Sequence, residues 1–329
     1  ENDPRVEAVE IPPDQRDDIK IGFNATQIAN FTKGGNPDTD TSKVNWGLKR
    51  ANMPTNLYAS GTTTDQNYEY ALEGEGVEVV RPKRTPEVEY YNYCPRDTVF
   101  VHGNRAFAAP MALAARETEW RHLLPGVAPI EIGHRIDRTG LYDESCVGDP
   151  DRLALTEVAP CFEAANAIRA NDDILYLVSN SGNKAGAAYL STWINKPENN
   201  FSEPGNIRVH RLENVYSYMH TDSTIAFLRE GLLLANPSRI KSMDVLPAPF
   251  NTWDVIWAPD PVDAGHYPGL CNSSIWTWNV NLFSVNPNLV VLEEHQEPTR
   301  KALEAHGIEC AMLPLRHART LGGCFHCCT

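Results

Sequence analysis

A degenerate repeat is the feature of this chain that most constrains its fold. An apolar run, a turn and a second apolar run lead into a more helical segment in DTVFVHGNRAFAAPMALAARETEW, NAIRANDDILYLVSN with AGAAYLSTWINK, STIAFLREGLLLANPSR, and VNLFSVNPNLVVLEEHQEPTRKALEAHG. The turns carry Gly, Asn, Asp or Pro, which are the residues that β-hairpins require. These strand–strand–helix–strand units repeat with a period in the fifties of residues. Such a repeat predicts a propeller-like array of α/β units around an axis.

The remaining segments complete this array as one domain over residues 1–329. ENDPRVEAVEIP is expected to supply an opening strand, and GTTTDQNYEYALEGEGVEVVRP a helix and a strand of the first unit. In the last unit, a helix is predicted from Pro298 to Gly307, followed by the strand IECAMLPL, because proline starts helices and glycine ends them. Residues 23–56 and 126–151 are rich in turn-forming residues and are expected to be long irregular loops.

Polar residues just ahead of each hairpin recur at the period of the repeat. They are Asp97, Glu163, His220, Ser273 and Cys327, and their separations are 66, 57, 53 and 54 residues. In a cyclic array these side chains converge on one central pocket. The alternative is a fortuitous spacing, but four of the five residues are titratable and the cysteine follows a histidine. We therefore predict a central active site.

The charge of the chain limits its partners. Its 329 residues carry a formal net charge of -14, and both a nucleic-acid backbone and an anionic membrane repel an acidic surface. No apolar run approaches the length of a membrane span, and the N-terminal segment is too polar for a signal peptide. We expect a soluble cytoplasmic protein that binds neither nucleic acid nor membrane, with a homodimer as one possible assembly.

The cysteines leave three interpretations of the C-terminal segment GGCFHCCT: a zinc site, a disulfide cluster or a catalytic thiol. Five of the eight cysteines are scattered singly, which is poor support for a disulfide framework. The terminal cluster lacks a second Cys-x-x-Cys or His-x-x-x-His, so zinc would need distant ligands. Residue types alone favour the thiol without excluding the other two.

Five ordered motifs occur in the chain: PRD with APM, CFEAAN, MHTD with NPSR, SSIW and, last, GGCFHCCT. They resemble, in the same order, motifs of the arginine:glycine amidinotransferase family, which belongs to the pentein superfamily of guanidine-modifying enzymes. GGCFHCCT is similar to the family signature G-G-x-F-H-C-x-T. The matches extend from Pro95 to Thr329. The resemblance implies a five-bladed α/β propeller, an enzyme without a cofactor or metal, and arginine as a substrate.

The resemblance also implies the catalytic residues. Cys327 takes the position of the nucleophile and His220 that of the acid/base, while Glu163 stands where the family has an aspartate. A guanidinium carbon is a poor electrophile, so a thiolate suits this chemistry, and a histidine can protonate the departing amine. His326 is expected to face away from Cys327, because adjacent strand positions point to opposite sides.

Five further residues occupy substrate-binding positions of the family. Asp97 and Asp222 match the carboxylates that bind the guanidinium group, which they would orient by bidentate hydrogen bonds. Arg239, Ser273 and Ser274 match the residues that hold the α-carboxylate of arginine.

The chain departs from the family pattern at three positions. Glu163 is one methylene longer than the usual aspartate, and Asn166 replaces a second acid. Ala114 replaces an arginine, which leaves Arg116 as the retained one.

We therefore predict an L-arginine:amine amidinotransferase that forms an amidino-cysteine and releases ornithine. The acceptor remains open among glycine, lysine, an amino-sugar derivative and a larger amine. An arginine deiminase-like hydrolase of the same superfamily is the alternative, because water could attack the same intermediate. A catalytically silent binding protein is the remaining alternative, which intact Cys327, His220 and Glu163 disfavour.

Overall fold

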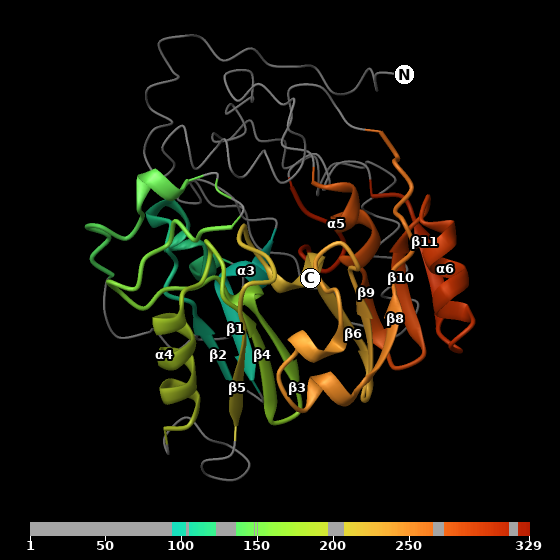
Figure 1. Ribbon diagram of the computed structural model, residues 1–329, viewed down its shortest axis with the longest axis horizontal. Helices are drawn as coiled ribbons and strands as arrows, with labels where there is room; N and C mark the ends of the chain where they lie inside the picture. Colours follow the sequence, from blue (N-terminus) through green and yellow to red (C-terminus); the bar gives the residue numbers. More distant parts are fainter. Residues whose placement is uncertain are drawn as a thin grey trace.

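The computed structural model describes residues 94–102, 105–122, 136–147, 149, 151–196, 207–265, 273–315 and 322–329. The predicted opening strand, the helix and strand that follow it and the loop over residues 23–56 lie outside these ranges. Figure 1 shows the strands spread across the molecule, with α4 (Lys184–Ile194) and α6 (Glu297–Glu304) at opposite outer edges.

Each predicted hairpin is present. The antiparallel pairs are β1 (Val99–His102) with β2 (Arg105–Ala108), β3 (Ala167–Ala170) with β4 (Asp173–Leu177), β6 (Ile225–Arg229) with β7 (Leu232–Ala235), and β9 (Phe283–Asn286) with β10 (Leu289–Glu293). The turn at Gly231 has a φ of 77°, a left-handed conformation that glycine adopts without a steric cost.

A third strand joins three of these hairpins in parallel. β5 (Arg208–Leu212) pairs with β4, β8 (Asp254–Trp257) with β7, and β11 (Glu309–Leu313) with β10. α4 and α6 lie in the connections to β5 and β11, while the connection to β8 holds only 3-10 turns. The predicted α/β architecture is confirmed. Four sheets lie in the described part of the chain, and a closed ring of five blades stays a prediction.

Local sequence explains where the two long helices begin and end. Asn183 caps α4 by accepting a hydrogen bond from the backbone N–H of Gly186 at 2.7 Å. α6 has a proline in its first turn, and Gly307 follows its end with a φ of 75°. The helix predicted from Pro298 to Gly307 is thus confirmed, with the end shifted to Glu304.

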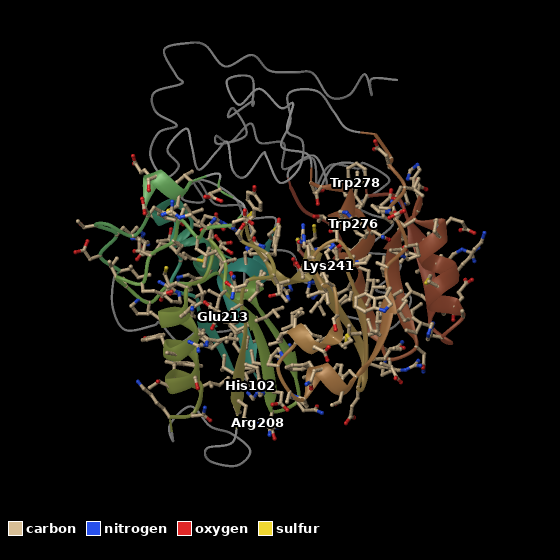
Figure 2. The ribbon with its side chains drawn as sticks, viewed as in Figure 1. His102, Arg208, Glu213, Lys241, Trp276 and Trp278 are labelled. Atoms are coloured by element: carbon tan, nitrogen blue, oxygen red, sulfur yellow. The ribbon has the colours of Figure 1, made fainter. Side chains whose placement is uncertain are left out.

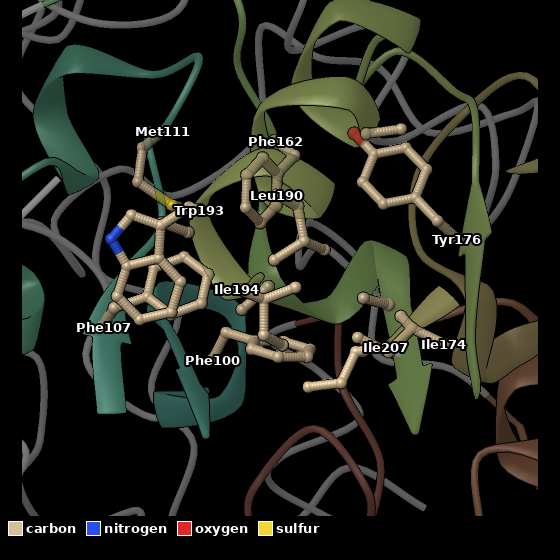
Figure 3. Packing of buried hydrophobic residues seen from close by; sticks show 14 of the residues in the cluster. Phe100, Phe107, Met111, Phe162, Ile174, Tyr176, Leu190, Trp193, Ile194 and Ile207 are labelled. Atoms are coloured by element: carbon tan, nitrogen blue, oxygen red, sulfur yellow. The ribbon is translucent and has the colours of Figure 1, made fainter. Parts of the chain in front are cut away.

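The largest described core cluster packs the first hairpin against the second unit (Figure 3). Phe107 of β2 lies against Trp193 of α4, with ring centroids 4.0 Å apart. Phe100, Ile174 and Ile194 belong to the same cluster. Burial of such apolar surface gives roughly 25 cal/mol per Å², so these contacts fix neighbouring units relative to each other.

The irregular loop predicted over residues 126–151 is described only in part. Its described residues contain one short 3-10 turn (Glu144–Cys146), which Asp143 caps by accepting from the backbone N–H of Ser145. Among the described residues, no helix is both long and apolar enough to cross a lipid bilayer.

Candidate active site

The short turn ahead of each hairpin carries one of the recurring polar residues. Asp97 lies in α3 (Pro95–Thr98), and Glu163 and His220 precede the 3-10 turns Ala164–Asn166 and Thr221–Ser223. Ser273 lies just before α5 (Ile275–Val280). Glu163 and His220 both have extended backbone conformations.

His220 lies between two carboxylates. Its Nε2 is 2.8 Å from Oε2 of Glu163, and its Nδ1 is 3.7 Å from Oδ1 of Asp97. Burial lowers the pKa of His220, but Asp97 and the hydrogen bond to Glu163 outweigh it and raise the pKa to about 10. The imidazole is therefore protonated at neutral pH and is ready to donate a proton.

Arg116 contacts the same two carboxylates. Its Nη1 donates to Asp97 Oδ2 at 3.0 Å and to Glu163 Oε2 at 3.1 Å, and its Nε donates to Glu119 at 3.0 Å. Burial acts to raise the pKa of Glu163, but Arg116 and His220 lower it below its ordinary value. Sequence reasoning noted Arg116 as a retained residue and missed this role.

The C-terminal turn brings Cys327 to a third carboxylate. Its Sγ lies 3.6 Å from Oδ2 of Asp222, which belongs to the same turn as His220. Burial acts to raise the pKa of Asp222, but His326 and Arg96 hold it well below its usual range. Asp222 is therefore an anion beside the thiol. The Thr221–Ser223 turn thus links the histidine group to the cysteine.

His326 is placed differently from the sequence prediction. Residues 325–328 form a turn, so the alternation of a strand does not apply, and His326 Nδ1 lies 3.2 Å from Asp222 Oδ2. Its Nε2 accepts a hydrogen bond from Arg96 Nε at 3.2 Å. Burial and Arg96 lower the pKa of His326, which fits a neutral ring that donates from Nδ1. The prediction that it faces away from the site of Cys327 was wrong.

A second thiol lies beside Cys327. The Cys94 side chain is hydrogen-bonded to Cys327, and burial together with this contact raises the pKa of Cys94 well above its ordinary value. Cys94 also accepts, through its carbonyl oxygen, a hydrogen bond from the backbone N–H of Asp97. Nothing in the sequence pattern pointed to Cys94.

Arg239 lies next to the turn that carries His220 and Asp222. Its Nη1 donates to the carbonyl and hydroxyl oxygens of Ser223 at 2.9 and 2.7 Å, and the guanidinium group lies 3.5 Å from the ring centre of Tyr216. The structure therefore ties Arg239 to the turn that carries His220 and Asp222, and its binding of a substrate carboxylate stays a prediction.

The two serines have local partners. Ser273 Oγ donates to the carbonyl of Gly323 and accepts from Trp278 Nε1, which links α5 to the C-terminal segment. Ser274 caps α5 by accepting from the N–H of Thr277. Trp276 and Trp278 belong to α5, the helix that follows the two serines, and Figure 2 shows them above His102 and Arg208 in the view. Binding of the substrate carboxylate by Ser273 and Ser274 stays a prediction.

The replacement of an acid by Asn166 has a structural reason. Asn166 is fully buried; its amide nitrogen donates to the carbonyl of Leu177 and the hydroxyl of Ser179, and its oxygen accepts from Ser181. This surrounding requires a donor and an acceptor on one side chain, which an amide supplies and an ionised carboxylate does not. Ala114, which replaces an arginine of the family, is exposed.

The same cluster has the spacing of a metal site. Ligand atoms of Asp97, Glu163 and His220 lie within 4.8 Å of one another. However, Arg116 already places a cation against both carboxylates, and a protonated His220 has no lone pair for a metal. We interpret the cluster as an ion-pair network that leaves Asp97 Oδ1, which has no hydrogen-bond partner in the described part of the chain, for a ligand.

Comparisons with known proteins identify the class of this chain. The chain is 34% identical over 248 residues to an inosamine-phosphate amidinotransferase of Streptomyces glaucescens, covering 73% of this chain and 67% of that one. It is 31% identical over 282 residues to an L-arginine:L-lysine amidinotransferase of Pseudomonas savastanoi, covering 78% and 74%. No family model matches the chain.

Solved structures also include an amidinotransferase similar to this chain. An inosamine-phosphate amidinotransferase from Streptomyces griseus superposes with a TM-score of 0.66 at 32% identity, over 80% of this chain and 77% of that one. A dimethylarginine dimethylaminohydrolase shares the fold alone, with a TM-score of 0.52 at 16% identity over 91% and 93%. The chain is a member of the pentein superfamily of guanidine-modifying enzymes. The chain belongs to the arginine:glycine amidinotransferase family and is an amidinotransferase.

Proposed function

We propose that the enzyme moves the amidino group of L-arginine to an amine acceptor through an amidino-Cys327 intermediate and releases ornithine. The observation that carries this proposal is the contact of Cys327 with ionised Asp222. The turn that holds Asp222 also carries protonated His220, which contacts Asp97. Buried carboxylates suit a planar cation that offers several N–H donors, because each compensates the desolvation of the other.

In the first step the Cys327 sulfur attacks the guanidinium carbon. The carbon–nitrogen bond to the ornithine side chain then breaks, and His220 gives its proton to the departing nitrogen. The pKa of about 10 for His220 keeps the proton available at neutral pH, and Glu163 holds the ring by its Nε2. The products of this step are ornithine, an amidino-enzyme and a neutral His220.

In the second step the acceptor amine attacks the amidino carbon. Neutral His220 takes a proton from that amine, the carbon–sulfur bond breaks, and the thiolate is restored. Because ornithine leaves before the acceptor reacts, the kinetics should be ping-pong. One histidine therefore serves both steps, and no cofactor is required.

The acceptor is not assigned to one compound. The names of the relatives include inosamine-phosphate, lysine and glycine amidinotransferases, and these compounds share only a primary amine. Arg239 supports the choice of arginine as donor, because its guanidinium group, held by Ser223 in the turn that carries Asp222, offers a cation for the α-carboxylate of arginine. The cytoplasmic location and the homodimer stay predictions.

Intact-protein mass spectrometry after incubation with arginine alone tests the proposal. We expect about one amidino adduct and one ornithine per wild-type enzyme, and no adduct on Cys327→Ala. Cys328→Ala is the matched control, since it removes the neighbouring thiol and should still form the adduct. With an acceptor present, Cys327→Ala should lower turnover by roughly a thousandfold or more.

Two outcomes contradict the proposal. Continuous formation of citrulline from arginine would identify a hydrolase, in which water releases the amidino group. An adduct that persists in Cys327→Ala would place the nucleophile on another residue.

A further inference from the structure

Asn281, at the junction between α5 and β9, contacts Cys327 with both ends of its side-chain amide. Its Nδ2 lies 3.1 Å from Cys327 Sγ, and its Oδ1 accepts from the Cys327 backbone N–H at 3.2 Å. We propose that Asn281 is a positioning residue that fixes the nucleophile and stabilises its thiolate form. This inference deepens the proposed function and rests on it for the role of Cys327.

The backbone around Asn281 is held from two sides. Asn281 ends α5, where its N–H donates to the carbonyl of Thr277 at 3.0 Å. Its own carbonyl accepts from the backbone N–H of His326 at 3.3 Å. With an exposed fraction of 1%, the side chain has no water to replace its partners. Three contacts from one residue therefore set the position of the C-terminal turn.

The chemistry of the two partners determines which way the amide points. The backbone N–H of Cys327 is only a donor, so the amide oxygen must face it. The amide nitrogen is then directed at the sulfur, to which it donates. A hydrogen bond to an ionised acceptor is stronger than one to a neutral acceptor, so this contact favours the thiolate over the thiol.

Two other groups near the sulfur act in different directions, because the Asp222 anion disfavours the thiolate and the Cys94 thiol donates a hydrogen bond that favours it. Asp222, from the turn after β5, is an anion 3.6 Å away, and Cys94, ahead of α3, is hydrogen-bonded to the same sulfur. Cys324 and Cys328 belong to the same cluster. None of these groups carries a positive charge. The Asn281 amide, together with the Cys94 thiol, thus donates to the sulfur and offsets Asp222 before arginine binds.

The pH dependence of alkylation tests this inference without substrate. The rate at which iodoacetamide modifies Cys327 is measured by peptide mass spectrometry across a pH series. Asn281→Asp preserves the size and the acceptor oxygen but replaces the donor by an acceptor. We expect alkylation at pH 7 to be about 10- to 100-fold slower, with the pH of half-maximal rate raised by about one to two units.

Asn279→Asp is the matched control. Asn279 is a buried asparagine of the same helix, and its Nδ2 donates to the carbonyl of Pro259 at 2.7 Å. The Asn279→Asp variant should lower the melting temperature by about as much as Asn281→Asp does. It should leave the pH dependence of Cys327 alkylation unchanged. A purely structural role for Asn281 predicts the same unchanged profile in both variants.

The outcomes separate this inference from the proposed function. A folded Asn281→Asp with the wild-type alkylation profile overturns the role of Asn281, even if Cys327 forms the amidino adduct. A shifted profile supports it even if arginine proves not to be the donor. If Asn281→Asp does not fold, Asn281→Ala gives the same measurement. Failure of both to fold while Asn279→Asp folds also contradicts a role centred on the thiol.

Discussion

At the scale of residues, the site is governed by the balance of buried charge. Three carboxyl groups, those of Asp97, Glu119 and Glu163, contact the single guanidinium group of Arg116. Protonated His220 supplies a second positive charge near two of them. Glu119 has no contact with His220 among the described interactions, and burial raises its pKa to about 8. Burial also raises the pKa of Asp97, and the raised pKa of Glu119 means that its carboxyl group holds a proton near neutrality.

This proton makes stability depend on pH. The pKa of Glu119 is raised from 4.5 to about 8 in the folded protein, so the folded state holds the proton more tightly than the unfolded state. Its contribution to stability is present below pH 4.5 and is lost as the pH rises toward 8. We expect the melting temperature to fall between pH 5 and 8, and to fall less in Glu119→Gln.

Calorimetry of the two proteins at four pH values measures this difference. Glu117→Gln is the control, because Glu117 is only partly buried and contacts Arg138 at 3.4 Å. It should follow the wild-type curve. Parallel curves for wild type and Glu119→Gln would show that Glu119 is ionised throughout this range.

At the scale of elements, close packing of α4 positions the segment that carries Glu163. A Cβ atom at Gly186 would lie 2.4 Å from the carbonyl oxygen of Cys161, closer than real contacts allow. Asn183 fixes the same segment by accepting from the N–H of Cys161 and donating to the carbonyl of Ala159. The first turn of α4 thus has a glycine because backbone must approach backbone.

Gly186→Ala tests this packing. Either the helix or the Cys161 segment must move, and overpacking of this kind costs about 1–3 kcal/mol. We expect a lower free energy of unfolding in urea, while Thr192→Ala, on the exposed side of α4, should change it by much less. Equal stability of Gly186→Ala and wild type would show that the contact relaxes without cost.

At the scale of the whole molecule, the site is assembled from separate units. Asp97, Glu163 and His220 each precede a different hairpin, and Cys327 comes from the C-terminal turn. Figure 1 shows the C-terminus near the middle of the molecule, close in the view to α3 and α5. A ligand that contacts several units should therefore stabilise all of them together.

Arginine should raise the melting temperature of Cys327→Ala, which retains the carboxylates and cannot react. At one hundred times its Kd, a ligand adds about 2.7 kcal/mol to the free energy of unfolding. The shift should be absent when Asp97→Asn is added, since one guanidinium partner is then lost. Lysine, a cation without the guanidinium plane, should give a smaller shift. Equal shifts with both amino acids would indicate binding by charge alone.

The sequence by itself predicted the hairpins, the presence of α6 and the places of the recurring polar residues. These follow from apolar periodicity and turn chemistry, which act between neighbours in the chain. It also predicted the family, through motifs that each lie within a few residues. It did not predict the contacts of Arg116 with Glu163 or of Asn281 with Cys327, which join residues 47 and 46 positions apart.

Tertiary structure alone decided the protonation and orientation of the site. His220 is a cation because two carboxylates from other units surround it, and His326 turns toward Asp222 because the C-terminal segment is a turn and Arg96 occupies its other nitrogen. Charge states of this kind depend on burial and on partners distant in sequence. The chain therefore encodes locally which residues the site contains, and only the packed molecule determines what each of them can donate or accept.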